Sequence, residues 1–219
     1  MTVLLDALGT LVELQPPAPR LQRLLREEGF EVTEEQASAG FAAEIAYYLA
    51  NHLEGSDRVR LDDLRDRCAT AMMEALALPD LDHATARRVM LGALEFTPYP
   101  DAPAAVRALH DDGRTVVVVS NWDCSLRDWL EPTGLLEHVD AVVTSADAGV
   151  AKPGRQMFER ALEAADATPD QAVHVGDSLE NDVEGARALG IRAVLVQREG
   201  PAPAGVEVVR SLLEVPALL

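Results

Sequence analysis

Two patterns of apolar and polar residues divide the chain. Between residues 16 and 94, apolar side chains recur every three or four positions, as on the buried faces of helices packed together. Almost no strand pattern occurs in this block, and prolines flank it at both ends. The predicted helix faces are Leu21, Leu24 and Leu25; Phe41, Ile45, Tyr48 and Leu49; Leu61, Leu64, Cys68 and Met72; and Val89, Leu91 and Leu94.

From residue 101 onward, short runs of Val, Leu and Ala alternate with helical segments. Continuous apolar strands between helices are typical of a parallel, doubly wound sheet. The run 2–6 has the same composition, so it belongs to this sheet. The predicted strands are 116–119, 141–143, 172–175, 193–196 and 206–209, and the predicted helices are 102–112, 126–136, 157–165 and 183–189.

These patterns predict an α/β fold with two domains. Residues 1–15 and 95–219 form a Rossmann-like core with a doubly wound parallel sheet, and residues 16–94 form an inserted α-helical domain. The apolar faces of the helices allow packing within the chain or against a second copy, so both a monomer and a homodimer remain open.

Composition narrows the class of protein. The chain has 219 residues, of which 48% are hydrophobic and 26% charged, and its net charge is −18. Such a charge repels nucleic acid and anionic membranes, so neither is an expected partner. The sequence shows no spanning apolar run and no signal peptide, and two cysteines make no disulfide framework. The expected location is the cytoplasm.

Polar residues follow several of the predicted strands. Asp6 ends the first predicted strand, and Ser120 and Asn121 follow the strand 116–119. Asp177 comes shortly after the strand 172–175, and Asp182 lies five residues further along the chain. The only lysine of the chain, Lys152, lies in a predicted loop beside Pro153. Parallel strands bring their carboxyl ends to one edge of the sheet, where α/β proteins bind ligands. These residues are therefore expected to converge there.

Each of these residues also has a purely structural interpretation. Asp6 could cap a turn, Ser120 and Asn121 could start a helix, and Asp177 with Glu180 resembles a capping pair. Lys152 alone could be a solvated side chain. The occurrence of all four segments in this order favours a shared site.

The chemistry of such a site follows from its residue types. Three carboxylates at short range, from Asp6, Asp177 and Asp182, require a positive charge between them. Mg²⁺ prefers such oxygen ligands and also binds phosphate. Lys152 and the hydroxyl of Ser120 can bind phosphoryl oxygens, and Asp6 can act as nucleophile through an aspartyl-phosphate. The sequence therefore predicts phosphoryl transfer from a small molecule.

Four segments together resemble the motifs of the haloacid dehalogenase-like (HAD) superfamily of hydrolases. They are residues 6–11 (DALGTL), 119–121 (VSN), 152–153 (KP) and 175–182 (VGDSLEND). The resemblance covers essentially the whole chain and implies that residues 16–94 are a helical cap that shields the site and selects a phosphorylated metabolite. It implies Asp6, Ser120 and Lys152 as catalytic residues. It also implies substrate contacts by Thr10, Ser120, Asn121 and Lys152, and Mg²⁺ ligands from Asp6, Asp177, Asp182 and the backbone carbonyl of Leu8.

Leu8 departs from the family's pattern. Phosphatases of the superfamily usually carry a second aspartate at this position, which protonates the leaving group and activates water. Asp123 lies near the second motif, but we predict that it caps a helix. Without the acid, the resemblance leaves three functions open: a Mg²⁺-dependent phosphatase that favours activated phosphates, a metal-independent 2-haloacid dehalogenase, or a weakly active or non-catalytic binding protein. The acidic pair Asp177 and Asp182 argues against a dehalogenase because it would repel a carboxylate substrate.

Two further residues have predicted structural roles. His174 lies in the middle of an apolar strand, so we predict a core histidine whose hydrogen bonds are satisfied. Cys124 follows the second motif without a histidine at a suitable spacing, so we predict a packing role.

Overall fold

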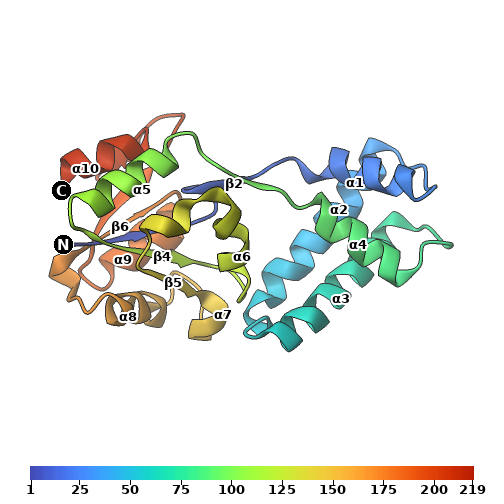
Figure 1. Ribbon diagram of the computed structural model, residues 1–219, viewed down its shortest axis with the longest axis horizontal. Helices are drawn as coiled ribbons and strands as arrows, with labels where there is room; N and C mark the ends of the chain where they lie inside the picture. Colours follow the sequence, from blue (N-terminus) through green and yellow to red (C-terminus); the bar gives the residue numbers. More distant parts are fainter. The chain divides into compact units, whose positions relative to one another are not determined.

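Six parallel strands form the sheet of the first of two units into which the structure divides (Figure 1). This computed structural model describes residues 1–219, and its first unit comprises Met1–Glu13 and Thr97–Leu219. The parallel α/β fold is confirmed. The strand order is β5-β4-β1-β6-β7-β8, and the strands are β1 (Thr2–Leu5), β4 (Thr115–Ser120), β5 (Ala141–Thr144), β6 (Ala172–Gly176), β7 (Arg192–Val196) and β8 (Glu207–Val209).

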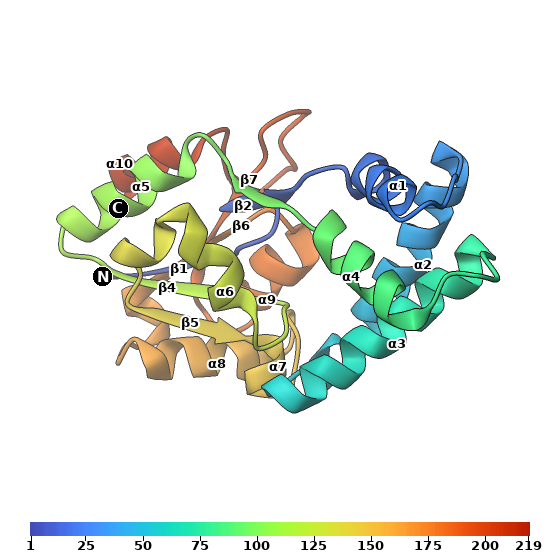
Figure 2. The same ribbon diagram turned by 45° about the vertical axis from the view of Figure 1, so that its right-hand side comes forward.

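Helices cover both faces of this sheet, with α5 and α10 on one face and α8 and α9 on the other (Figures 1 and 2). Leu4, Val117 and Val119 of neighbouring strands pack against Met157 and Phe158 of α8 in one apolar cluster. The helices of the unit are α5 (Ala102–Asp111), α6 (Leu126–Leu130), α7 (Ser145–Ala148), α8 (Arg155–Ala164), α9 (Gly185–Arg187) and α10 (Val215–Leu218).

The order of the strands explains where the site lies. Leu4 of β1 pairs with Val117 of β4 on one side and with His174 of β6 on the other. The chain continues outward from β4 to β5, then returns to β6 and continues outward to β7 on the opposite side. The carboxyl ends of β1 and β6 therefore border the point at which the winding reverses, where sheets of this type bind ligands.

Two predicted helices of this unit differ in the structure. The helix predicted over 126–136 ends at Leu130 and continues as two 3₁₀ turns, Glu131–Thr133 and Leu135–His138. Pro132 removes a backbone donor, and Gly134 has a φ of +73°, so the α-helix cannot continue. The helix predicted over 183–189 begins earlier, with a π-helical turn at Leu179–Glu184, and its α-helical part is only α9. Further 3₁₀ turns are Pro169–Gln171 and Leu212–Glu214.

The second unit, Leu14–Phe96, consists mainly of four helices. Thr33 and Gln36 form a capping box at the start of one helix, and Asp57 and Asp82 cap the two helices that follow. None of the helices in the structure is both long and apolar enough to cross a membrane. The helices are α1 (Pro17–Glu27), α2 (Glu34–Asn51), α3 (Arg58–Leu76) and α4 (His83–Ala93), with a 3₁₀ turn at His52–Glu54.

Two short strands at the boundaries between the two units had no counterpart in the sequence patterns. They are β2 (Val12–Leu14) and β3 (Phe96–Pro98), which pair in a separate two-stranded sheet.

The buried face of α2 differs from the predicted one. Phe41 is buried as expected, but Leu49 is 62% exposed, and Glu44 is buried instead. Gly40 lies against Leu76 of α3, where a side chain at position 40 would collide with the leucine. The absence of a side chain at Gly40 lets the two helices approach closely and turns the Glu44 side of α2 toward α3.

The burial of Glu44 predicts a pH-dependent stability. Burial raises the pKa of Glu44 from 4.5 to about 7, although a hydrogen bond with Cys68 opposes the shift. The folded state then holds the proton more tightly than the unfolded state, so stability falls as the pH rises from 4.5 to 7 and levels off above. The fall is about 3 kcal/mol for this group. Urea unfolding of the wild type and of Glu44→Gln at several pH values should show this fall in the free energy of unfolding.

The glutamine variant serves as the reference because it lacks the titrating group. Relative to Glu44→Gln, the wild type is expected to lose stability between pH 5 and pH 8. A difference that is constant across this range would contradict a buried, titrating carboxyl at position 44.

Candidate active site

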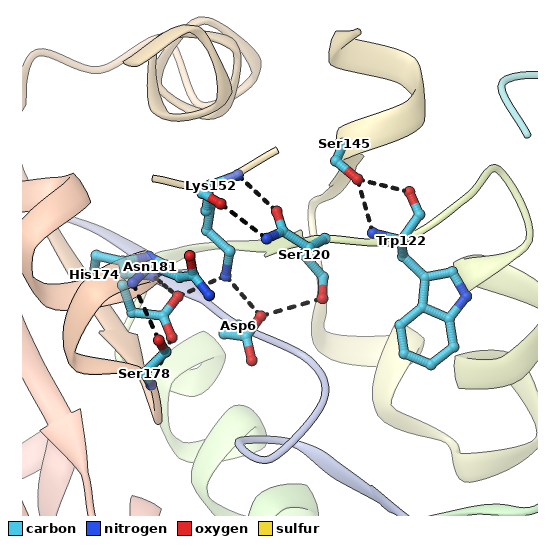
Figure 3. A network of polar contacts seen from close by, with 10 residues as sticks. Asp6, Ser120, Trp122, Ser145, Lys152, His174, Ser178 and Asn181 are labelled. Carbon is cyan, nitrogen blue, oxygen red and sulfur yellow. Dashed lines mark hydrogen bonds and ion pairs between the residues drawn. The ribbon is translucent and has the colours of Figure 1, made fainter. Parts of the chain in front are cut away.

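Asp6 lies at the centre of the polar network that follows the strands (Figure 3). Its backbone N–H donates to the carbonyl of Val175 at 2.9 Å, which extends the pairing of β1 with β6 by one residue. Its buried carboxylate accepts hydrogen bonds from Lys152 Nζ at 2.7 Å and from Ser120 Oγ at 3.1 Å, both on Oδ1. Among the residues drawn in Figure 3, no hydrogen bond reaches the second oxygen, Oδ2. The structure therefore holds one oxygen and leaves the other free to react.

Hydrogen bonds hold both the backbone and the side chain of Lys152 in place. The amide oxygen of Asn121 accepts the backbone N–H of Lys152 at 2.7 Å, and the amide nitrogen donates to the Lys152 carbonyl at 3.0 Å. The side chain of Lys152 is 2% exposed, and its ammonium bridges Asp6 and Asp182, the latter at 2.6 Å. Lys152 is thus a buried counter-charge. Asn121, predicted to contact substrate, uses both ends of its amide to hold the lysine backbone.

Ser120 and Asn121 are not the start of a helix. Ser120 is the last residue of β4, and the loop after Asn121 is fixed by Ser145 Oγ, which accepts the N–H of Trp122 at 2.9 Å and donates to its carbonyl at 3.1 Å (Figure 3). The structural interpretation of this segment is therefore wrong, and the hydroxyl of Ser120 is available to the site.

Asp182 is surrounded by donors. Its Oδ1 accepts from Lys152 and from His174 Nε2 at 2.9 Å, and its Oδ2 accepts the backbone N–H of Ser178 at 2.9 Å. A side chain at position 176 would collide with this carboxylate, so Gly176 is required at the end of β6. Asp182 therefore lies in a cradle of donors, with a lone pair of Oδ2 left for a cation.

Asp177 lies at the exposed edge of the site. The capping interpretation of this residue is wrong, because Ser178 is the N-cap of the turn that follows, with its Oγ accepting the N–H of Asn181 at 3.1 Å. Gly9 has a φ of +88°, and any side chain there would collide with the carboxylate of Asp177. The loop after Asp6 therefore lies directly against Asp177. Thr10, which follows Gly9 in this loop, was predicted to contact substrate. In the structure it is fully buried, and its Oγ1 has no hydrogen-bond partner.

The charged groups of the site shift one another's pKa values. Burial raises the pKa of Asp6 to about 6, and Asp182 adds to the rise, while Lys152 opposes it. Burial also acts on Asp182, but attraction to Lys152 and the hydrogen bond from His174 outweigh it and hold the pKa of Asp182 below its usual range. The pKa of Asp177 is raised by burial and by the charge of Asp182. One lysine thus does not fully offset three carboxylates.

The three carboxylates suit a divalent cation. Asp6, Asp177 and Asp182 each offer one oxygen, and these oxygens lie within 4.8 Å of one another. Hard oxygen donors at this spacing are typical ligands of Mg²⁺. A cation there would supply the positive charge that Lys152 alone does not.

Sequence reasoning missed two residues beside the site. His174 was predicted to have its hydrogen bonds satisfied, but only Nε2 is bonded, and Nδ1 is buried without a partner. Arg198 donates to the carbonyl of Thr10 at 3.0 Å and to Asp101 Oδ2 at 2.8 Å, with its guanidinium 3.8 Å from the centre of the Tyr99 ring. Arg198 therefore ties the loop after Asp6 to residues 99–101. The sequence offered one signal for His174, which is a polar residue in an otherwise apolar strand. Nothing in the sequence pointed to a role for Arg198 at the site.

Comparison with models of protein families shows to which family the chain belongs. The model of the haloacid dehalogenase-like hydrolases matches residues 1–190. The chain belongs to this family.

Similar curated proteins include haloacid dehalogenase-like hydrolase domain-containing proteins and a phosphatase. The chain is 44% identical over 102 residues to haloacid dehalogenase-like hydrolase domain-containing protein 3 of Bos taurus, covering 47% of this chain and 40% of that protein. It is 33% identical over 129 residues to a phosphoserine phosphatase of Thermus thermophilus, covering 58% and 52%. The chain thus spans about half the length of these curated relatives.

Solved structures match over nearly the whole chain. A HAD phosphatase from Thermococcus onnurineus has a TM-score of 0.67 and 25% identity, covering 99% of this chain and 96% of that one. An L-2-haloacid dehalogenase from Xanthobacter autotrophicus has a TM-score of 0.74 and 22% identity, covering 99% and 97%, and shows a common fold.

Position 8 holds a leucine, two residues after Asp6. Its side chain is 43% exposed and carries no proton to donate. Asp123 is buried, and its Oδ1 accepts the backbone N–H of Ser125 at 2.7 Å. The capping prediction for Asp123 is wrong, because the N-cap of α6 is Ser125 and no side chain caps this helix. The site therefore brings Asp6 together with Lys152, Asp177 and Asp182, while position 8 holds no acidic side chain.

Proposed function

We propose that this HAD-like hydrolase is a Mg²⁺-dependent phosphomonoester phosphatase with Asp6 as nucleophile. The observation that carries the proposal is the free Oδ2 of Asp6, in a carboxylate whose other oxygen is held by Lys152 and Ser120. The acidic residues around it favour a cation and a phosphate over the carboxylate substrate of a dehalogenase. The phosphoserine phosphatase among the relatives gives further support.

The reaction proceeds in two steps at Asp6. Oδ2 attacks the phosphorus of the substrate, and the bond from phosphorus to the leaving oxygen breaks, which gives an aspartyl-phosphate on Asp6. Water then cleaves this acyl phosphate, releases inorganic phosphate and restores the carboxylate. Lys152 and the Ser120 hydroxyl bind the phosphoryl oxygens and offset their charge.

The cation would be held by Asp6, Asp177 and Asp182, together with the backbone carbonyl of Leu8. Bound Mg²⁺ would neutralise phosphoryl charge and allow an anionic nucleophile to approach an anionic substrate.

The leucine at position 8 affects the departure of the leaving group. Because no acid lies two residues after Asp6, alkoxides leave without a proton, and the site favours phosphates with good leaving groups, such as acyl or aryl phosphates.

The helical unit Leu14–Phe96 is proposed as the cap that selects the substrate, a small phosphorylated metabolite. The net charge of −18 repels nucleic acid, so nucleic acid is not a proposed partner, and the cytoplasm is the proposed location.

A turnover assay tests the proposal. The wild type is expected to release phosphate from an aryl phosphate with Mg²⁺, to lose this activity with a chelator, and to release no chloride from 2-chloropropionate. Asp6→Asn is expected to remove phosphate release, because an amide oxygen is a far weaker nucleophile than a carboxylate. Arg160→Ala serves as the control, because it removes only an exposed ion pair with Glu163 at α8.

Two other outcomes would favour the alternative functions. Chloride release without metal, and without phosphate release, would establish a dehalogenase. No turnover of either substrate, with Asp6→Asn indistinguishable from wild type in Mg²⁺ binding and thermal stability, would support a binding protein instead.

A further inference from the structure

His174 is a fully buried polar ring at the centre of the sheet. It lies in β6, between Leu4 of β1 and Ala193 of β7, and its ring meets Phe158 edge-on at 5.2 Å. A polar group in such surroundings costs free energy unless it is hydrogen-bonded. An aliphatic side chain would fill the same place without that cost, so the imidazole calls for an explanation.

The ring makes a single hydrogen bond, and its partner belongs to the site. Nε2 donates to Oδ1 of Asp182 at 2.9 Å, while Nδ1 is buried without a partner (Figure 3). A histidine kept only for the stability of the core would be expected to have both nitrogens satisfied. The polarity of His174 is therefore directed at Asp182 alone.

Asp182 needs this contact to keep one orientation. Its other donors are the backbone N–H of Ser178 on Oδ2 and the ammonium of Lys152 on Oδ1. Lys152 carries a flexible side chain and is shared with Asp6. His174 is the donor to Oδ1 that projects from a central strand, so its own position is fixed by the sheet.

A continuous chain of contacts thus connects the core to the nucleophile. His174 bonds Asp182 at 2.9 Å, Asp182 bonds Lys152 at 2.6 Å, and Lys152 bonds Asp6 at 2.7 Å. If Asp182 rotates, Lys152 loses one of its two anchors, and the oxygen offered to a cation moves as well.

We propose that His174 is a positioning residue, which fixes the carboxylate of Asp182 and, through it, the ammonium of Lys152 beside Asp6. His174 touches neither substrate nor reacting atoms. The inference rests on the proposed phosphatase function, since it concerns the same three carboxylates and their cation.

Variants of His174 separate positioning from packing. His174→Phe fills the space without a donor, and His174→Gln keeps an N–H donor at a similar reach. His174→Asn keeps an amide that is one carbon too short to reach Asp182. Removing a residue that orients a metal ligand typically lowers metal affinity or activity by about 10- to 100-fold.

Two measurements are made on each purified full-length variant. The first is the Mg²⁺-dependent rise of the melting temperature in the absence of substrate, which reports cation affinity independently of turnover. The second is kcat and KM for an aryl phosphate. We expect His174→Phe and His174→Asn to weaken Mg²⁺ binding and lower kcat by about 10-fold or more with little change in KM, and His174→Gln to recover most of both.

The outcomes divide as follows. Wild-type Mg²⁺ affinity and kcat in both His174→Phe and His174→Asn would overturn the inference, as would a His174→Gln variant that loses as much as they do. If His174→Phe does not fold, the comparison of asparagine with glutamine decides by the same criterion. A wild type that neither binds Mg²⁺ nor releases phosphate would refute the proposed function, and the role of His174 with it. An active wild type with unaffected variants refutes only the role of His174.

Discussion

Lys152→Met is expected to abolish phosphate release and to destabilise the protein by about 3–5 kcal/mol, because it removes the shared counter-charge of two buried carboxylates. Lys152 bonds both Asp6 and Asp182, and all three side chains are less than a tenth exposed. Methionine fills nearly the same space but leaves both carboxylates without a positive counter-charge, with only the hydrogen bonds from Ser120, His174 and Ser178 remaining. Protonation of the carboxylates relieves this repulsion, so the loss should be larger at pH 8 than at pH 5. Urea unfolding at the two pH values measures it.

Two further variants make this experiment specific. Arg155→Met removes a cation three residues away whose side chain is 67% exposed, and it should cost less than about 1 kcal/mol. Adding Asp6→Asn to Lys152→Met should recover part of the stability, because one unpaired charge disappears, without recovering activity. Equal, small effects of Lys152→Met and Arg155→Met would contradict a buried counter-charge at position 152.

Leu8→Asp is expected to raise turnover of alkyl phosphates by about 10²–10⁴-fold, the usual contribution of a positioned general acid. Aryl phosphates should gain much less, because their leaving groups depart without a proton. The side chain of Leu8 is 43% exposed, so a carboxylate there stays hydrated and folding should be little affected. The ratio of kcat/KM for the two substrate types is the measurement.

Leu8→Asn is the matched control for this gain, since it has nearly the same shape and polarity but no acidic proton. It should leave the ratio of the two substrates unchanged. An equal gain of Leu8→Asp on both substrates, or a gain that Leu8→Asn reproduces, would mean that the site lacks something other than protonation of the leaving group.

The predicted sheet and most of its site residues could be derived from local patterns. A strand of buried Val and Leu needs no distant partner to be recognised, and Asp6 and Asp177 stand directly after such strands. Parallel pairing then places them at one edge, and Asp6 with Lys152 lies there in the structure. The absence of an acid at Leu8 is likewise a property of the sequence alone.

Contacts over long distances along the chain could not be derived in this way. Arg198 bonds the carbonyl of Thr10 from 188 residues away, and neither residue signals the other. The buried side of α2 was predicted wrongly for a related reason, since the missing side chain at Gly40 lets α3 pack closely on the side of Glu44.

The sequence by itself therefore determined the α/β fold, the residues that end its strands and the missing acid at Leu8, because each depends on neighbours within a few positions. Only the tertiary structure decided what those residues touch: Asn121 holds the backbone of Lys152, and His174 holds Asp182. The physical reason is that a hydrogen bond depends on side-chain direction and on distances of about 3 Å. Periodicity and spacing determine neither.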